Sequence, residues 1–174
     1  MKYEKLFSRG KIGNLDLKNR IVMPAMGTSL ALSTGEASDE IIRYYEERAQ
    51  GGCGLIITEI TRIDDETGVG TPCQLCANDL KFIPRLEKLA RAVHRHDSKI
   101  FLQLHHPGRE NHAALINGRQ IVGPSAVMSS AIGEMPRELT TEEVQELVKK
   151  FVFGGYIAKC AGIDGVEIHG AHGY

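Results

Sequence analysis

The chain has 174 residues, of which 25% are charged, and its formal net charge is −1. This length suits one ordinary domain, and so balanced a charge gives no electrostatic reason to bind nucleic acid or an anionic membrane surface. No apolar run approaches the roughly 18 residues that a membrane-spanning helix needs, and the first five residues lack the apolar core of a signal peptide. We therefore expect a cytoplasmic protein without a nucleic-acid or membrane partner.

Four short segments rich in apolar and β-branched residues predict strands. They occupy residues 20–23, 54–59, 99–104 and 165–169. The second is apolar enough to be buried on both faces, as the strands of parallel sheets are.

A helical pattern follows each of the first three strands. Ser38 is a good N-cap for the first helix, and the second is predicted over residues 81–96. Thr140 or Thr141 begins the third, where the sequence fits a capping box. The two glycines at 154–155 weaken the middle of that helix, because glycine has a low helix propensity.

This alternation of strands and helices implies an α/β fold with a parallel sheet and right-handed crossovers. Four such units make half of a TIM (β/α)8 barrel, for which about 250 residues is a typical length. A small doubly wound domain is the rival interpretation, and it needs no missing half. We favour a barrel of which the chain contains the first four β/α units, because polar residues follow all four strands.

The richest of these polar segments is the last one. Residues 165–168 alternate as in a strand, and His169, His172 and Tyr174 follow within six residues. Chemistry sits at the carboxyl ends of barrel strands. Two imidazoles can hold a carbonyl oxygen or an oxyanion, and a phenol can donate a proton. Taken alone, the two histidines could also be capping or core residues.

Other polar residues allow simpler interpretations. The loop from 105 to 139 is long enough to suggest a functional role, but its histidines lack companions at metal-ligand spacing, so we expect no metal site. His94 and His96 are explained by a helix C-terminus, where the dipole favours imidazole. Glu59 could act as a base, but a structural hydrogen-bonding role is favoured.

The chain has four cysteines. Cys73 and Cys76 have the spacing of a metal or redox motif. A tetrahedral metal site needs about four ligands, and no second pair of this kind occurs. We expect reduced thiols, with Cys160 in the core because it continues a helical apolar pattern.

Five motifs in chain order resemble the Old Yellow Enzyme family of FMN-dependent ene-reductases. They lie at residues 17–24, 48–59, 103–109, 123–126 and 165–174. The segment at 24–28 is most similar to the enoate reductase and 2,4-dienoyl-CoA reductase branch, whose members usually continue with an iron–sulfur (4Fe-4S) segment and a pyridine-nucleotide domain. The resemblance implies that residues 1–174 are the N-terminal half of an FMN-binding barrel whose remainder is absent from this chain.

The resemblance also implies a role for each site residue. His169 and His172 would bind the carbonyl oxygen of the substrate, and Tyr174 would give a proton to its α-carbon. Thr28 would contact the substrate as well. Contacts to the flavin ring would come from Pro24, Ala25, Met26, Gly27, Ile60, which follows the second strand directly, and Gln103. Family members often carry a polar side chain where Gly27 stands, so tuning of the flavin by that position is absent here.

The implied reaction is hydride transfer from NADH or NADPH, through FMN, to the C=C bond of an enone, enoate or enoyl substrate. Negative charge then builds on the carbonyl oxygen, where preorganised donors stabilise the transition state. Half of a barrel would have open sheet edges and exposed apolar surface, so we also expect a homo-oligomer. Two alternatives stay open: another barrel enzyme, such as a different flavin dehydrogenase, and a non-catalytic truncated fragment of a barrel.

Overall fold

The computed structural model describes residues 2–174. Its centre is a parallel sheet, in which β3 (Val22–Met23), β4 (Leu55–Arg62), β6 (Lys99–His105) and β9 (Gly165–Ile168) lie side by side in that order. The short strand β5 (Leu75–Cys76) pairs with the carboxyl end of β4. The four predicted strands are therefore confirmed, and their chain order is also their spatial order.

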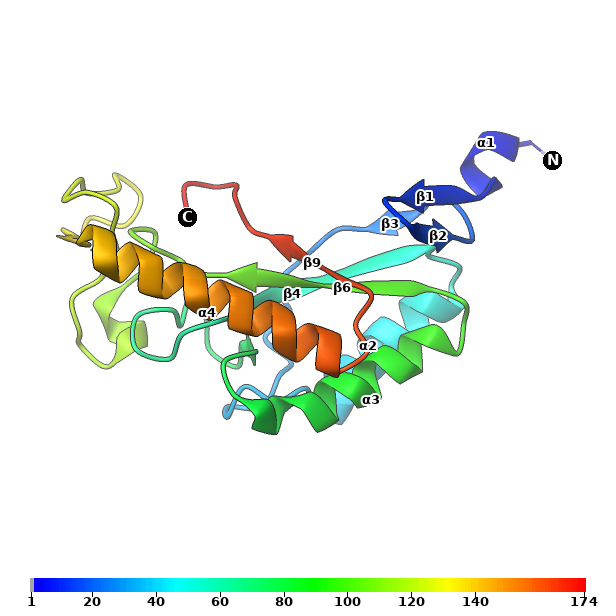
Figure 1. The fold of residues 1–174 in the computed structure, drawn as a ribbon, viewed down its shortest axis with the longest axis horizontal. Helices are drawn as coiled ribbons and strands as arrows, with labels where there is room; N and C mark the ends of the chain where they lie inside the picture. The colour runs from blue at the N-terminus through cyan, green and yellow to red at the C-terminus, as the bar shows by residue number, and fades with distance from the viewer. Residues whose placement is uncertain (1) are drawn as a thin grey trace.

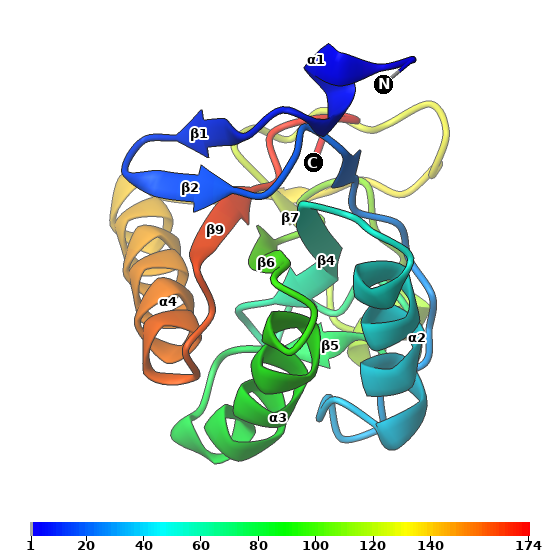
Figure 2. The same cartoon turned by 90° about the vertical axis from the view of Figure 1, so that its right-hand side faces the viewer.

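Three helices connect these strands and cover one face of the sheet (Figures 1 and 2). They are α2 (Asp39–Gln50), α3 (Ile83–His94) and α4 (Thr141–Cys160). The strand–helix alternation of parallel units is that of a (β/α)8 barrel, and the described residues contain its first four strands and three helices. None of these helices combines the length and apolar character that crossing a membrane requires.

The remaining elements are short. The helix α1 (Glu4–Phe7) precedes a hairpin of β1 (Gly10–Ile12) and β2 (Leu15–Leu17), which Figure 1 shows at the end of the sheet opposite to the C-terminus. A 3₁₀ turn, η1 (Leu80–Phe82), leads into α3. The long loop contains η2 (Ala113–Ile116) and a pairing of β7 (Val122–Gly123) with β8 (Arg137–Glu138). The sequence patterns did not predict these pieces.

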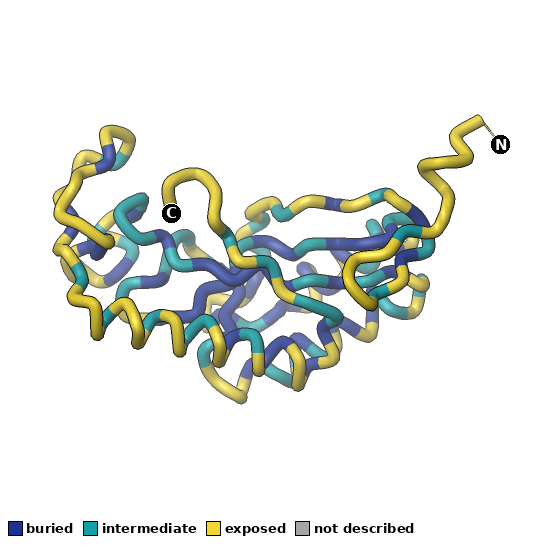
Figure 3. The backbone as a smooth tube through the Cα atoms, turned by 45° about the horizontal axis from the view of Figure 1, so that its top comes forward, coloured by how far each residue is buried: buried dark blue, intermediate teal, exposed yellow. Residues whose placement is uncertain are grey.

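The core lies between the sheet and its helices, and appears as the dark-blue interior in Figure 3. Alternate residues of β6 face the helices, and all three of these side chains are fully buried: Ile100, Leu102 and Leu104. They belong to one apolar cluster with residues of all three helices, including Tyr45, Leu89 and Ile157. The other residues of β6 face the uncovered side of the sheet, where Gln103 is found.

Both predicted helix starts are confirmed. The Ser38 hydroxyl accepts a hydrogen bond from the Ile41 amide, 3.0 Å away. Thr140, not Thr141, caps α4, and both hydrogen bonds of its capping box with Glu143 are present. These bonds satisfy amides that the first helical turn leaves without a partner.

The helix α4 continues without a break through the two glycines at residues 154–155, where the sequence predicts a weakened middle. At Gly154 the helix lies in close contact with the core under the sheet. A Cβ atom there would lie 2.9 Å from Cγ2 of Ile63 and 3.2 Å from Cδ2 of Leu104. The missing side chain therefore permits close packing, which offsets the low helix propensity of glycine.

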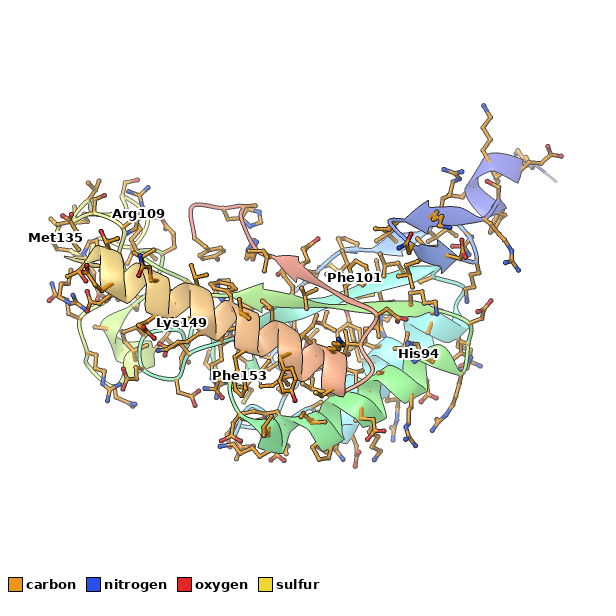
Figure 4. The ribbon with its side chains drawn as sticks, viewed as in Figure 1. His94, Phe101, Arg109, Met135, Lys149 and Phe153 are labelled. Carbon is orange, nitrogen blue, oxygen red and sulfur yellow. The ribbon has the colours of Figure 1, made fainter. Side chains whose placement is uncertain are left out.

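Three smaller expectations also need correction. Strand β4 extends to Arg62, so Ile60 lies inside it and not just after it. Cys160 is exposed, because the last turn of α4 turns that side chain away from the sheet. His94 has more than a helix-terminal role, since its Nε2 lies 2.7 Å from Oδ2 of Asp164 and ties the end of α3 to the turn before β9 (labelled in Figure 4).

Candidate active site at the carboxyl ends of the strands

A hollow of about 290 Å³ opens where the carboxyl ends of the four strands meet. Its lining comes from all four strand ends and comprises Ala25, Met26, Gly27, Ile60, Gln103, His169, His172 and Tyr174. The structure thus brings together eight of the ten predicted site residues. Pro24 and Thr28 do not line the hollow.

The three ring-bearing residues after β9 form one cluster. Nδ1 of His172 faces Nε2 of His169 at 3.5 Å. The ring of Tyr174 lies with its centroid 4.9 Å from that of His169 and 6.2 Å from that of His172. With a hydrogen on each of these nitrogens, one oxygen atom lying beside the pair could accept a hydrogen bond from both.

The turn that gathers these rings uses an unfavourable backbone conformation. His172 has φ 61° and Gly173 has φ 81°. The first value is costly for a residue with a side chain, whereas glycine adopts it readily. Such outliers often occur at functional sites, where the surrounding structure holds them.

The surroundings of His169 favour its neutral form. Partial burial lowers its pKa, and the neighbouring His172 lowers it further, while Glu167 has a smaller opposite effect. A neutral imidazole has one N–H donor and one acceptor nitrogen. His169 can therefore donate to an oxygen without bringing a positive charge into the hollow.

The segment after β3 lines the hollow, and its peptide groups are available to a ligand. Within residues 2–174, no protein group hydrogen-bonds to the peptide groups of Ala25, Met26 or Gly27. The segment is anchored one residue later, where the amide and hydroxyl of Thr28 both donate to Oε2 of Glu59; the amide distance is 2.6 Å. Thr28 therefore serves as an anchor, which supports the structural interpretation of Glu59.

Burial raises the pKa of Glu59, and the hydrogen bonds from Thr28 oppose this effect. The Glu59 backbone amide donates to the hydroxyl oxygen of Tyr45 on α2, 2.7 Å away. Glu59 therefore links Tyr45 of the core and strand β4 to the segment that lines the hollow.

A β-bulge in β4 determines which of its side chains reach the hollow. Ile57 pairs with Phe101, but Ile60 pairs with Gln103, so β4 advances three residues while β6 advances two. The Thr58 hydroxyl accepts a hydrogen bond from the backbone amide of Gln103 at 3.3 Å and donates one to the backbone carbonyl oxygen of Glu59 at 3.1 Å. The polar groups that the bulge removes from the ladder are thereby satisfied.

Gln103 is buried, and its side chain has a carboxylate partner that the sequence did not reveal. Its Nε2 donates to Oε1 of Glu167 on the adjacent strand, at 2.6 Å. The two residues are register partners, so their side chains share one face of the sheet. Strand pairing was the only signal for this contact, and it cannot be read from sequence spacing alone.

His105 is a second residue that sequence reasoning missed. It is 1% exposed, and its ring is 4.7 Å from that of Tyr174 and 5.4 Å from that of His169. Its Nε2 has no hydrogen-bond partner among residues 2–174. Burial lowers its pKa to about 3, with smaller contributions from His169 and His106. It therefore supports the ring cluster as a neutral side chain.

The donors along the hollow fit the ring end of FMN. The pyrimidine edge of a flavin carries both hydrogen-bond donors and acceptors, and it would meet the unpaired backbone of residues 25–27 and the amide of Gln103. Among residues 2–174, no three His, Cys, Asp or Glu side chains lie together as a metal site would need. Cys73 and Cys76 are free thiols.

A parallel α/β sheet whose strand ends carry such a cluster has the layout of a barrel enzyme. The chain belongs to the NADH:flavin oxidoreductase / NADH oxidase family, whose model matches residues 5–174. It is 48% identical over 172 residues to an NADH oxidase of Thermoanaerobacter brockii, which covers 99% of this chain and 26% of that protein.

Two solved structures extend the comparison. A 2-naphthoyl-CoA reductase is 31% identical with a TM-score of 0.91, over 99% of this chain and 28% of that one. An Old Yellow Enzyme homologue from Zymomonas mobilis is 30% identical with a TM-score of 0.86, over 98% of this chain and 49% of that one. The chain thus spans between about a quarter and a half of these relatives, which confirms the prediction of a partial barrel.

Proposed function

We propose that residues 1–174 form the N-terminal half of an FMN-binding barrel that reduces the C=C bond of an α,β-unsaturated carbonyl compound with NADH or NADPH. The observation that carries this proposal is the hollow in which His169, His172 and Tyr174 face Gln103 and the bare backbone of residues 25–27. FMN, when bound, supplies the hydride that it receives from the nicotinamide.

His169 and His172 are the donors for the carbonyl oxygen of the substrate. Their facing nitrogens are close enough to share one acceptor, and each imidazole ring can supply one N–H. Negative charge grows on that oxygen as the C=C bond is reduced, so two fixed donors stabilise the transition state more than the ground state.

Tyr174 is the proton donor for the α-carbon. Its ring lies next to both histidines, and a phenol is protonated at neutral pH. The rings of His105 and His169 pack against it and limit its orientation. A positioned acid of this kind accelerates a reaction by about 10²–10⁴-fold.

Gln103 and the backbone of residues 25–27 are the groups that would hold the flavin ring. The similarity to 2-naphthoyl-CoA reductase favours an enoyl thioester among the possible substrates. A 4Fe-4S segment beyond the barrel, a homo-oligomeric assembly and a cytoplasmic location are further parts of the proposal.

An anaerobic assay of the full gene product tests the proposal. The enzyme is reduced with NADH and then mixed with an enoate, a 2-enal or a dienoyl-CoA, and absorbance near 450 nm reports reoxidation of the flavin. Reoxidation by at least one of these compounds, with the saturated product found by mass spectrometry, is expected. A flavin that none of these compounds reoxidises, and that is reoxidised only after air is admitted, would contradict the C=C activity and leave an NADH oxidase.

A further inference from the structure

Gln103 has an amide whose orientation is fixed by a carboxylate. Glu167 can only accept hydrogen bonds when ionised, so the Gln103 atom 2.6 Å from its Oε1 must be the NH₂ group. A hydrogen bond to a charged acceptor is stronger than one between neutral groups. The two ends of the amide are therefore not interchangeable.

The other end of that amide is free to serve a ligand. Oε1 of Gln103 has no protein partner within residues 2–174, and it is not among the buried atoms that lack a partner, so it remains accessible. Gln103 itself lines the hollow. Its carbonyl oxygen is thus an acceptor that faces the ligand space.

We propose that Glu167 is a positioning residue that holds the Gln103 amide with its carbonyl oxygen toward the hollow, where it selects a ring N–H donor of the ligand. The matching group on a flavin is the imide N3–H of the pyrimidine edge. This inference rests on the proposed flavin site, and it assigns a task to a carboxylate that does not itself line the hollow.

The position of Glu167 couples this task to the reaction site. Side chains alternate along a strand, so Glu167 and His169 leave β9 on the same side of the sheet. Gly165 lets β9 approach β6 closely, because a Cβ there would lie 2.6 Å from the ring of Phe101 (labelled in Figure 4). One strand end therefore positions both the flavin-facing amide and the donors for the substrate oxygen.

The test compares the binding of FMN and of 3-methyl-FMN, whose N3 carries a methyl group in place of the hydrogen. Apoprotein of the full gene product is titrated, and quenching of flavin fluorescence gives the dissociation constants. The natural protein should prefer FMN by about tenfold. Glu167→Leu should weaken FMN binding by about tenfold and reduce that preference, and Glu167→Gln should have a smaller effect of the same sign.

A double-mutant cycle separates positioning from general damage to the fold. In a Gln103→Ala background, Glu167→Leu should cause no further loss of FMN affinity. Asp16→Asn removes one exposed charge from the hairpin at the far end of the sheet and should leave both constants unchanged. If the leucine variant does not fold, the glutamine variant gives the same readouts.

Two results would overturn the inference. One is an unchanged preference for FMN over 3-methyl-FMN in the folded Glu167 variants. The other is an equal loss of affinity with and without Gln103. Because no substrate is present in these titrations, the outcome is independent of whether the enzyme reduces C=C bonds.

Discussion

The two faces of the parallel sheet differ in burial and in the residues that they carry. Toward the helices, Ile56, Leu102 and Leu104 are fully buried in one apolar cluster. On the other face, Val22 is 42% exposed at one end of the sheet, and at the opposite end Gln103 and the rings after β9 line the hollow. The helix-covered face therefore supplies most of the stability, and the uncovered face carries the chemistry, so substitutions on the two faces should have separable effects.

The largest separation is expected from Tyr174→Phe, which removes one hydroxyl on the chemical face. Reoxidation of the reduced flavin by an unsaturated substrate should slow by about 10²–10⁴-fold, because it needs a proton donor. Flavin reduction by the nicotinamide and the unfolding midpoint should not change. Stopped-flow absorbance of the two half-reactions makes the comparison, and equal slowing of both would contradict the assigned role.

Leu102→Ala should show the reverse pattern. Truncation of a fully buried leucine leaves a cavity against the helices, and we expect a loss of about 2–5 kcal/mol in the free energy of unfolding. Val22→Ala removes an apolar group that is exposed on the other face of the 174-residue chain, and in that chain it should change this free energy by about 0.5 kcal/mol or less. Urea denaturation followed by circular dichroism measures both, and similar losses would refute the division between the faces.

The carboxyl end of β6 should impose a pH dependence on folding. Burial lowers the pKa of His105 to about 3 and that of His106 to about 4. Between pH 6.5, the usual value for histidine, and pH 4, the unfolded chain binds protons that the folded chain excludes, so stability should fall as the pH falls. Each histidine can contribute about 1.4 kcal/mol per pH unit below pH 6.5.

Urea midpoints measured from pH 7 to pH 4 report that slope. His105→Gln should flatten it, whatever its effect on stability at pH 7. His112→Gln, at an exposed site beside Glu134, is the matched control. An identical slope in the His105 variant and the natural protein would show that this histidine accepts a proton without unfolding.

The smallest predicted effects come from two neighbouring glycines of α4. Gly154→Ala should destabilise the fold by about 1–3 kcal/mol, because its methyl group would press against Ile63 and Leu104. At Gly155 a Cβ atom would meet nothing within 4 Å. Gly155→Ala should therefore stabilise the fold by about 0.5–1 kcal/mol through helix propensity, and thermal unfolding of the two variants should show shifts of opposite sign.

Local patterns in the sequence were sufficient for much of this structure. Ser38 and Thr140 are caps because their hydroxyls act on amides two or three residues away, which spacing reveals. The cluster of His169, His172 and Tyr174 was predicted for a similar reason, since all three belong to one short segment. The assignment of roles to these residues stays a prediction.

Contacts between segments were beyond the same reasoning. The pairing of Gln103 with Glu167 depends on strand register, and the burial of His105 depends on a tail 64 or more residues later in the chain. The helix α4 shows the limit most clearly. Its apolar residues occur on more than one side, so that Val148 is exposed, and periodicity wrongly placed the exposed Cys160 in the core.

The bulge in β4 shifts the register of this strand relative to β6 by one residue. Up to Ile57 the strand keeps the alternation that buries Ile56 against the helices, and from Ile60 onward it is one residue out of step with β6. With unbroken alternation, Glu59 would lie level with Gln103 and bring a carboxylate into the hollow. The extra residue instead keeps that carboxylate on Thr28 and leaves an isoleucine beside the amide. A deletion of Thr58 would remove the extra residue and keep Ile60 opposite Gln103, but Glu59 would then lie level with Leu102, and its carboxylate would face the apolar cluster under the helices instead of Thr28.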